Sequence, residues 1–224
     1  MAGRRSYGDP CGIARALDAI GERWALLVVR ELVLGPKRFT DLRAGLPNLT
    51  PDMLSQRLRD LTAAGVVARR RLAPPAGSQV YELTERGREL EDVLLALGRW
   101  GSTAPLPPRG HDIGVDSTIL GLRTLFAPSN ADGFDASVEL RLGEQTFRAR
   151  VEDGSFEVVR GATERPDAAL TTGPGSLAAL VWQGRSLADA ERAGEVEVEG
   201  DRSALARFLA LFPLPAADPQ PTNR

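Results

Sequence analysis

Cysteine, histidine and aromatic residues are scarce in this 224-residue sequence, and long hydrophobic runs are missing. The single cysteine, Cys11, cannot close an internal disulfide, and one histidine, His111, leaves no Cys/His set for a structural zinc. The longest strictly apolar stretches, such as residues 24–29, fall far short of the roughly 20 residues that cross a bilayer. Residues 1–9 are not followed by the apolar core of a signal peptide. We therefore expect a cytoplasmic protein with no membrane contact, no metal and no cofactor.

Charge is distributed unequally along the chain. Residues 1–104 carry 16 basic and 12 acidic side chains, whereas residues 105–224 carry 12 and 18. A proline cluster, Pro105, Pro107 and Pro108, marks the change. The length allows two small domains, each able to bury a core. A basic domain joined to an acidic one predicts that only the first meets a polyanion.

The first half reads as helices followed by a hairpin. Apolar spacing and stop signals predict helices over residues 11–20, 24–34, 40–46, 51–64 and 84–100. Thr40, Thr50 and Thr84 are the expected N-caps. A β-hairpin is expected from strands at 66–72 and 79–83, around a Pro/Gly turn. Leu90, Val93, Leu94 and Leu97 form the apolar face of the last helix.

The helix that Thr50 begins has two unlike sides. Leu54, Leu58 and Leu61 form one stripe at 100° per residue. The opposite side carries Asp52, Ser55, Gln56 and Arg59. On an isolated helix such a side is usually only a solvated surface. As the second helix of a helix-turn-helix, however, it would enter a major groove, where Gln can pair with adenine and Arg with guanine.

The order helix, helix, helix-turn-helix, hairpin, helix is that of a winged helix. Short sequence motifs occur along this arrangement of elements. They are Cys11-Gly12-Ile13, residues 18–27 (DAIGERWALL), Arg30-Glu31-Leu32, residues 35–42 (GPKRFTDL), 54–61 (LSQRLRDL), Gly65-Val66-Val67 and 81–88 (YELTERGR). In this order and spacing they resemble the HxlR-type transcriptional regulators. The hairpin tip, residues 74–79, is longer than the usual wing of that family.

A DNA interface is predicted around the second helix of the helix-turn-helix. Helix starts and the hairpin arm should supply phosphate contacts. The predicted interface consists of Lys37, Arg38, Thr50, Asp52, Ser55, Gln56, Arg59, Arg69 and Arg71. Any one of these arginines, taken alone, could be a surface charge without a role. A C2 dimer is expected, since two such helices must meet half-sites about one turn apart. The helices ending near Ile20 and Trp100 are the candidate seam.

Trp24, Trp100 and Cys11 each allow two interpretations. The tryptophans could stack on a ligand, but their apolar helical neighbours favour packing in a core or between subunits.

Cys11 precedes the first helix, where a thiol can be activated. The HxlR resemblance implies a candidate redox role, because some members use an N-terminal thiol as an oxidant sensor. We favour the alternative, a small apolar residue that begins a helix.

The second half is predicted to segregate a sheet from its helices, which indicates an α+β fold. Strands are expected at 134–142, 144–151, 156–160 and 168–172, and helices at 113–126, 175–182 and 203–212. Residues 166–170, 177–182 and 193–201, within a region spanning 112–215, resemble sterol carrier protein type 2. That resemblance implies an apolar cavity for lipid-like molecules. The candidate pocket residues, for which core packing is the alternative, are Leu180, Val181, Trp182, Phe208 and Phe212.

The expected α+β organisation is a winged helix-turn-helix DNA-binding and dimerisation domain (1–104), a linker (105–111), a sterol-carrier-like sensing domain (112–215) and a disordered tail (216–224). No nucleophile elbow or phosphate loop is present, and Ser176 is interpreted as a helix cap, so an enzyme is not expected. The predicted function is a ligand-responsive repressor that binds double-stranded DNA as a homodimer at a pseudo-palindromic operator. The predicted effector is a small hydrophobic molecule. The alternative is a lipid or hydrophobic small-molecule carrier with a DNA-tethering domain.

Overall fold

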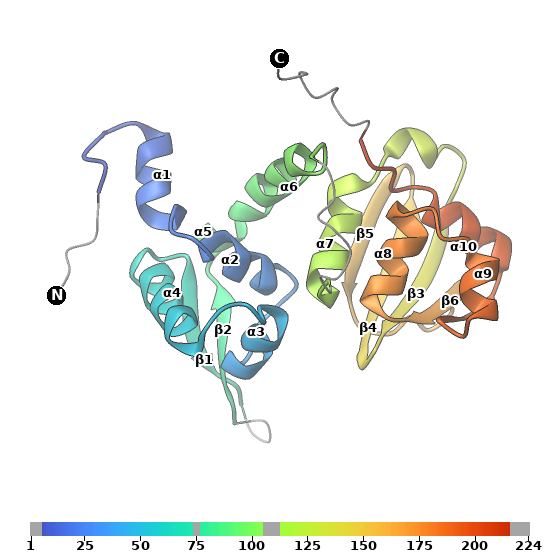
Figure 1. The fold of residues 1–224 in the computed structure, drawn as a ribbon, viewed down its shortest axis with the longest axis horizontal. Helices are drawn as coiled ribbons and strands as arrows, with labels where there is room; N and C mark the ends of the chain where they lie inside the picture. The colour runs from blue at the N-terminus through green and yellow to red at the C-terminus, as the bar shows by residue number, and fades with distance from the viewer. Residues whose placement is uncertain (1–5, 74–76, 105–112, 216–224) are drawn as a thin grey trace, which may run out of the picture. The chain divides into compact units, whose positions relative to one another are not determined.

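The computed structural model describes residues 6–73, 77–104 and 113–215 (Figure 1). The chain divides into two compact units, residues 1–94 and 95–224. The expected linker 105–111 with His111, the hairpin residues 74–76 and the expected tail 216–224 lie outside the described residues. In the part of the chain that is described, no helix is long and apolar enough to cross a membrane.

The first unit is a winged helix-turn-helix. Its elements are α1 (Gly12–Ile20), α2 (Ala25–Val33), α3 (Phe39–Gly45), α4 (Pro51–Ala63), β1 (Val67–Arg71), β2 (Gln79–Leu83), α5 (Glu85–Arg88) and the start of α6 (Leu90–Gly101). The antiparallel pair β1 and β2 places Arg69 opposite Tyr81 and Arg71 opposite Gln79. A bridge from Lys37 to Tyr81 joins the segment before α3 to this hairpin. The predicted order of elements is confirmed.

Two expected helix starts differ from the structure. The helix after Lys37 begins at Phe39 with Arg38 as its N-cap, not at Thr40, because Asp41 Oδ2 accepts the Arg38 backbone N–H at 3.0 Å. Thr84 does cap a helix, accepting the Gly87 N–H at 3.0 Å, but that helix is only α5, and α6 begins separately at Leu90. Because Thr84 also donates to the Gly65 carbonyl at 2.7 Å, α5 is fixed to the base of the hairpin.

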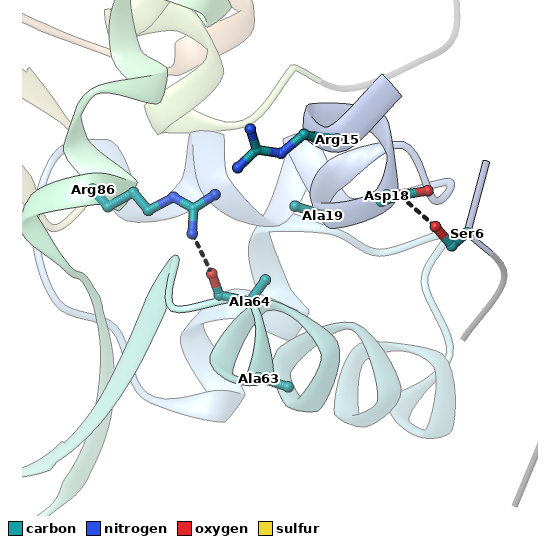
Figure 2. Close-up of a pocket in the computed structure, with 7 residues that line it drawn as sticks. All are labelled: Ser6, Arg15, Asp18, Ala19, Ala63, Ala64 and Arg86. Carbon is teal, nitrogen blue, oxygen red and sulfur yellow. Dashed lines mark hydrogen bonds between the residues drawn. The ribbon is translucent and has the colours of Figure 1, made fainter. Parts of the chain in front are cut away.

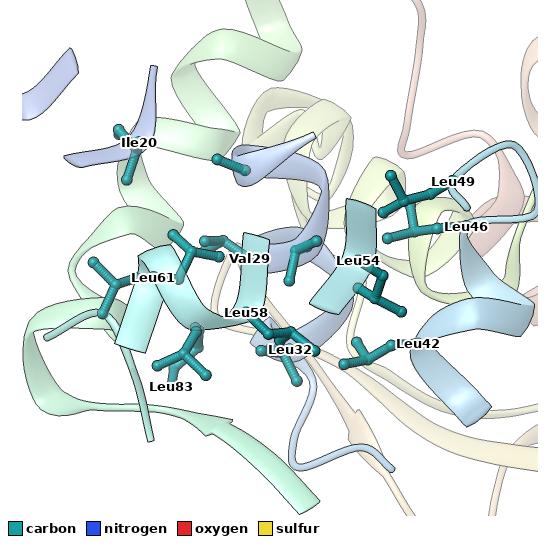
Figure 3. Packing of buried hydrophobic residues seen from close by; sticks show 14 of the residues in the cluster. Ile20, Val29, Leu32, Leu42, Leu46, Leu49, Leu54, Leu58, Leu61 and Leu83 are labelled. Carbon is teal, nitrogen blue, oxygen red and sulfur yellow. The ribbon is translucent and has the colours of Figure 1, made fainter. Parts of the chain in front are cut away.

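The leucine stripe of α4 lies in the core of the first unit (Figure 3). Leu54, Leu58 and Leu61 are buried in one cluster with Val29 and Leu32 of α2 and other apolar residues. Burial of leucine side chains is a main source of stability in a domain of this size. The stripe therefore fixes which side of α4 faces outward.

The second unit has one five-stranded sheet and helices. Its elements are α7 (Val115–Leu125), a 3-10 turn (Pro128–Asn130), β3 (Ala136–Leu142), β4 (Gln145–Glu152), β5 (Ser155–Arg160), β6 (Ala168–Thr172), α8 (Pro174–Trp182), α9 (Leu187–Arg192), β7 (Val196–Gly200) and α10 (Arg202–Leu209). The strand order is β5-β4-β3-β6-β7, in which only β3 and β6 are parallel. The α+β class is confirmed.

The sheet buries one face. Along β4, Phe147, Ala149 and Val151 are buried, whereas Arg148 and Arg150 between them are exposed. Helix α8 begins at Pro174 with Gly173 as its N-cap, so the expected cap Ser176 lies inside the first turn instead. The last helix ends at Leu209, three residues before the expected end, and α9 was not predicted at all.

Candidate nucleic-acid interface

Helix α4 is held by its cap and its leucines. Thr50 Oγ1 accepts the Met53 N–H at 3.4 Å, and Pro51 occupies the first helical position, where its missing N–H costs nothing. Opposite the buried leucines, Asp52, Gln56 and Arg59 are exposed and Ser55 is half-buried. The four polar residues predicted for this side are thus placed on the outward half of the helix.

Gln56 and Arg59 are joined on that outward side. Arg59 Nη2 donates to Gln56 Oε1 at 2.7 Å, and Gln56 Nε2 donates to Asp60 Oδ1 at 2.8 Å. These exposed hydrogen bonds hold the two side chains together at small net energy, about 0.5–1.5 kcal/mol each. The Arg59 guanidinium keeps N–H groups for an outside acceptor, because its five donors exceed the one bond shown.

Lys37, predicted to contact phosphate, lies mostly inside the unit. Its side chain is 12% exposed, and its Nζ donates at 2.6 Å to Glu31 Oε2, whose side chain is 2% exposed. Arg30 Nη2 reaches the other oxygen of Glu31 at 2.8 Å. Since an ammonium in such a buried pair is tied to its partner, the structure gives Lys37 a different place from the one expected.

Glu31 is a buried carboxylate that sequence reasoning missed. Burial alone would raise the pKa of Glu31, but Lys37 and Arg30 hold that pKa below its ordinary value. A side chain at Gly45 would meet Glu31 Oε2 at 2.1 Å, so the end of α3 rests against this carboxylate. The Glu31 carboxylate therefore connects α2 to the segment between α2 and α3, through Lys37, and lies against the end of α3. A lone acidic residue within the apolar run of α2 was the available signal.

The arginines of the hairpin differ in their partners: one is paired with a carboxylate and two donate to neutral acceptors. Arg70 forms a two-point ion pair with Glu82, at 2.8 and 2.9 Å, which lowers the pKa of Glu82. Arg69 donates to Gln79, and Arg71 Nε donates to the Gly77 carbonyl at 3.2 Å. Both of these acceptors are neutral, so no carboxylate offsets the charge of Arg69 or Arg71 in these bonds. Arg38, at the start of α3, is likewise exposed.

The remaining residues singled out in the first half are spread over its helices. Cys11 is a free, exposed cysteine at the N-cap position of α1. Trp24 packs against the core, with the Arg23 guanidinium 5.3 Å from the centre of its ring. Trp100 is 76% exposed on α6, so packing in the core of its own chain does not hold for this residue.

The five candidate pocket residues lie in or beside the helical layer of the second unit. Leu180, Val181 and Trp182 are half-buried on α8, and Trp182 Nε1 donates to the Phe212 carbonyl at 3.1 Å. Phe208 and Phe212 are fully buried, with ring centres 5.2 Å apart. Phe156 and Phe126 complete this phenylalanine cluster. These contacts bring Trp182, Phe208 and Phe212 together at one apolar cluster, and Leu180 and Val181 precede Trp182 on α8.

A winged helix with an outward row of Gln and Arg, and with cationic side chains on the hairpin, defines a DNA-binding helix-turn-helix protein. Comparisons with known proteins agree. The family model described as HxlR-like helix-turn-helix matches residues 19–106. A second model, described as alkyl sulfatase C-terminal, matches residues 126–218. The sterol-carrier resemblance expected for the second half is not confirmed by this match.

Individual relatives cover the same first unit. The HTH-type transcriptional regulator YvaP of Bacillus subtilis is 35% identical over 88 residues, which are 39% of this chain and 82% of the relative. YkvN of the same organism is 38% identical over 91 residues, 41% and 77% of the two chains. A solved structure of the redox regulator HypR in its oxidized form is 35% identical, covers 43% of this chain and 100% of that one, and has a TM-score of 0.39.

The chain therefore belongs to the HxlR-like helix-turn-helix family, through its first unit. It is a DNA-binding transcriptional regulator. The curated relatives that match are named as transcriptional regulators and not as enzymes.

Proposed function

We propose that the protein is a dimeric, ligand-responsive repressor that reads a pseudo-palindromic operator with α4. The observation that carries this proposal is the division of α4 into two sides. Its leucines are buried, which leaves Gln56 and Arg59 outward on a fixed helix. In a major groove these two side chains can read adenine and guanine, and Asp52 and Ser55 lie beside them.

Phosphate contacts would come from the exposed cations that surround α4. Arg38, Arg69 and Arg71 have no carboxylate partner among the described residues. Thr50 stands at the N-terminus of α4, where backbone N–H groups favour an anion. Lys37 is left out of this set, because its ammonium is bound to Glu31.

The proposed dimer rests on apolar side chains that the single chain leaves exposed. Ile13 is 72% exposed on α1, and Leu17 is also exposed there. Helix α6 exposes Val93, Leu97 and Trp100. Large apolar side chains gathered on a helix side mark an interaction surface. We propose that a second copy of the chain covers these exposed sides of α1 and α6, because an operator with two half-sites requires a two-fold symmetric dimer.

The second unit is proposed as the sensing domain for a small hydrophobic effector. Its net acidic charge would repel a DNA duplex, so DNA affinity is not its expected contribution. Half-buried apolar side chains on α8, of which Trp182 bonds to the phenylalanine cluster at the Phe212 carbonyl, support an apolar ligand, in keeping with the sterol-carrier resemblance. A carrier tethered to DNA is the alternative, and it would not need base-specific contacts.

The test is to map the DNA that the full chain protects in the region upstream of its own gene. A repressor of the proposed kind protects two half-sites about one helical turn apart. The Arg59→Ala variant should lose this protection, whereas the Arg202→Ala variant, whose guanidinium pairs with Glu191 in the second unit, should keep it. Protection that is equal for the wild type and Arg59→Ala, or independent of DNA sequence, would favour the tethered carrier.

A further inference from the structure

A surface hollow in the first unit lies at the C-terminal end of α4, beyond the proposed reading residues Gln56 and Arg59. It has a volume of about 430 Å³ and lies between α1, the end of α4 and α5 (Figure 2). Its volume is within the range of small-molecule sites, which runs from about 300 to 1,000 Å³. Nothing in the DNA-binding role described above uses its lining residues.

Two guanidinium groups line this hollow. Arg15 extends from α1 and Arg86 from α5, and Figure 2 shows both pointing toward the same space. Among the described residues the Arg15 guanidinium has no hydrogen-bond or ion-pair partner. Arg86 Nη1 donates to the Ala64 carbonyl at 3.1 Å, which leaves its other N–H groups for a further acceptor. Two like charges that line one hollow favour an anion between them.

The one acidic residue in the lining already has donors. Asp18 accepts the Ser6 hydroxyl at 2.8 Å and the Tyr7 backbone N–H at 2.9 Å. Its carboxylate therefore holds the segment that precedes α1. With two arginines against one aspartate, the lining keeps a net positive charge.

The rest of the lining includes small apolar groups. Ala19 of α1 and Ala63 and Ala64 at the end of α4 contribute methyl groups. A carboxylate matches a guanidinium in a two-point, charge-assisted hydrogen bond, and a short apolar body matches the methyl groups. We infer that this hollow is a binding site for a small carboxylate that has an apolar body, such as a single aromatic ring.

The position of the hollow gives the bound anion a regulatory role. Ala63 is seven residues beyond Gln56 on α4, about 10 Å along the axis at 1.5 Å per residue, so the hollow adjoins the C-terminal end of the proposed reading helix. A ligand held by Arg15 and Arg86 links α1 to α5, and Arg86 is in turn bound to the Ala64 carbonyl at the end of α4. Resting on the proposed function, in which α1 belongs to the dimer seam, this link changes the placement of the reading helices and hence the operator affinity.

Binding is tested first without DNA. Sodium benzoate and inorganic phosphate are titrated separately into the full chain by calorimetry, at constant ionic strength set with chloride. Benzoate should bind, and the Arg15→Gln variant should bind it at least about tenfold more weakly, as expected for one lost charge-assisted hydrogen bond. Phosphate tests the head group alone and should bind more weakly than benzoate.

Matched variants distinguish binding by the two lining arginines from a general effect of positive charge on benzoate affinity. Arg88→Gln removes a neighbouring exposed cation of α5 that does not line the hollow, and it should leave benzoate affinity unchanged. Arg86→Gln should weaken benzoate as Arg15→Gln does. Equal benzoate affinity in the wild type and in Arg15→Gln, or an equal loss in Arg88→Gln, overturns the site. Phosphate binding tighter than benzoate overturns the assigned ligand class.

The regulatory step is then measured on the protected upstream DNA. Benzoate should change the DNA dissociation constant of the wild type by the same factor by which DNA changes benzoate affinity, typically about 5- to 150-fold. The Arg15→Gln variant should bind the DNA and no longer respond to benzoate. Benzoate binding with unchanged DNA affinity overturns the effector role alone, whereas absence of specific DNA binding in the wild type overturns the proposed function and leaves the benzoate site in place.

Discussion

The two units treat their arginines differently. In the second unit Arg141, Arg150, Arg160, Arg185 and Arg202 each form an ion pair with a carboxylate. In the first unit Arg30, Arg57 and Arg70 are paired in the same way. By contrast, Arg59, Arg69 and Arg71 donate to neutral acceptors, namely two glutamine side chains and a backbone carbonyl. The second unit thus neutralises much of its own positive charge. The first unit leaves part of its charge available, as binding to a polyanion requires.

The largest expected effect is a loss of stability when one of the buried leucines that orient α4 is removed. Leu58→Ala should lower the free energy of unfolding by about 2–5 kcal/mol, because it removes a fully enclosed side chain and leaves a cavity. Urea denaturation measures this loss, with Met53→Ala on the exposed side as the matched control. A loss no greater than that of the control would mean that the leucines do not fix the helix.

The outward side itself should affect binding and not stability. Gln56→Ala and Arg59→Ala should each weaken operator binding by about 1–3 kcal/mol, with unchanged unfolding curves. Fluorescence anisotropy with labelled operator gives the affinities, and Arg202→Ala, from the neutralised set, should have no effect. Unchanged affinity in both α4 variants would disprove base reading by this side.

The hairpin allows the same comparison within a single strand. Arg69→Ala or Arg71→Ala should weaken binding to all DNA sequences similarly and reduce the slope of log K against log salt by about 1. Arg70→Ala should change the slope less, because Glu82 already neutralises this arginine. A changed base preference with an unchanged slope would contradict the assignment of Arg69 and Arg71 to phosphate.

The buried pair in the first unit predicts a dependence of stability on pH. Since the folded state lowers the pKa of Glu31, its contribution to stability is present above the unfolded pKa of about 4.5 and is lost as the pH falls through the folded value. Unfolding of the wild type and of Glu31→Gln should be compared between neutral and acidic pH. A variant that loses as much stability as the wild type over this range would show that Glu31 is not responsible.

The smallest expected effect is at the exposed thiol. Cys11→Ser should leave DNA binding unchanged under reducing conditions, since Cys11 has no role in the proposed interface. The check is a mobility-shift assay with and without peroxide. Release of the wild type but not of Cys11→Ser by peroxide would establish the redox role that we do not favour.

The fold of the first unit could be predicted because local signals and periodicity agree there. Thr50, Pro51 and Gly65 mark the ends of α4, and its leucines follow the helical period. The split between α5 and α6 could not be seen, because Thr84 supplies a cap signal just ahead of the periodic apolar residues of α6, so the pattern reads as one helix. In the second unit α9 was missed, since six residues are too few to show a periodic pattern.

The candidate site shows the same limit. The exposed residues of α4 could be placed from the 100° spacing alone. The position of Lys37 could not, because Lys37 lies in the segment between α2 and α3, and only the path of that segment brings its ammonium to 2.6 Å from Glu31 of α2. Exposure of Trp100 likewise depends on which elements pack nearby, and the sequence allowed both a core and a subunit interface.

The parallel pairing of β3 with β6 sets the order in which the chain can fold during synthesis. Val138 pairs with Ala168, and Ala168 pairs in turn with Gly200 at the edge strand, so the sheet cannot be completed until the chain has been made to that point. The winged unit consists of α1 to α5, the hairpin and the start of α6, all of which precede the first strand of this sheet. Pairings between distant residues form slowly, and domains fold from the N-terminus as the ribosome releases them. The winged unit can therefore fold on the ribosome before the strands of the second unit have all been translated.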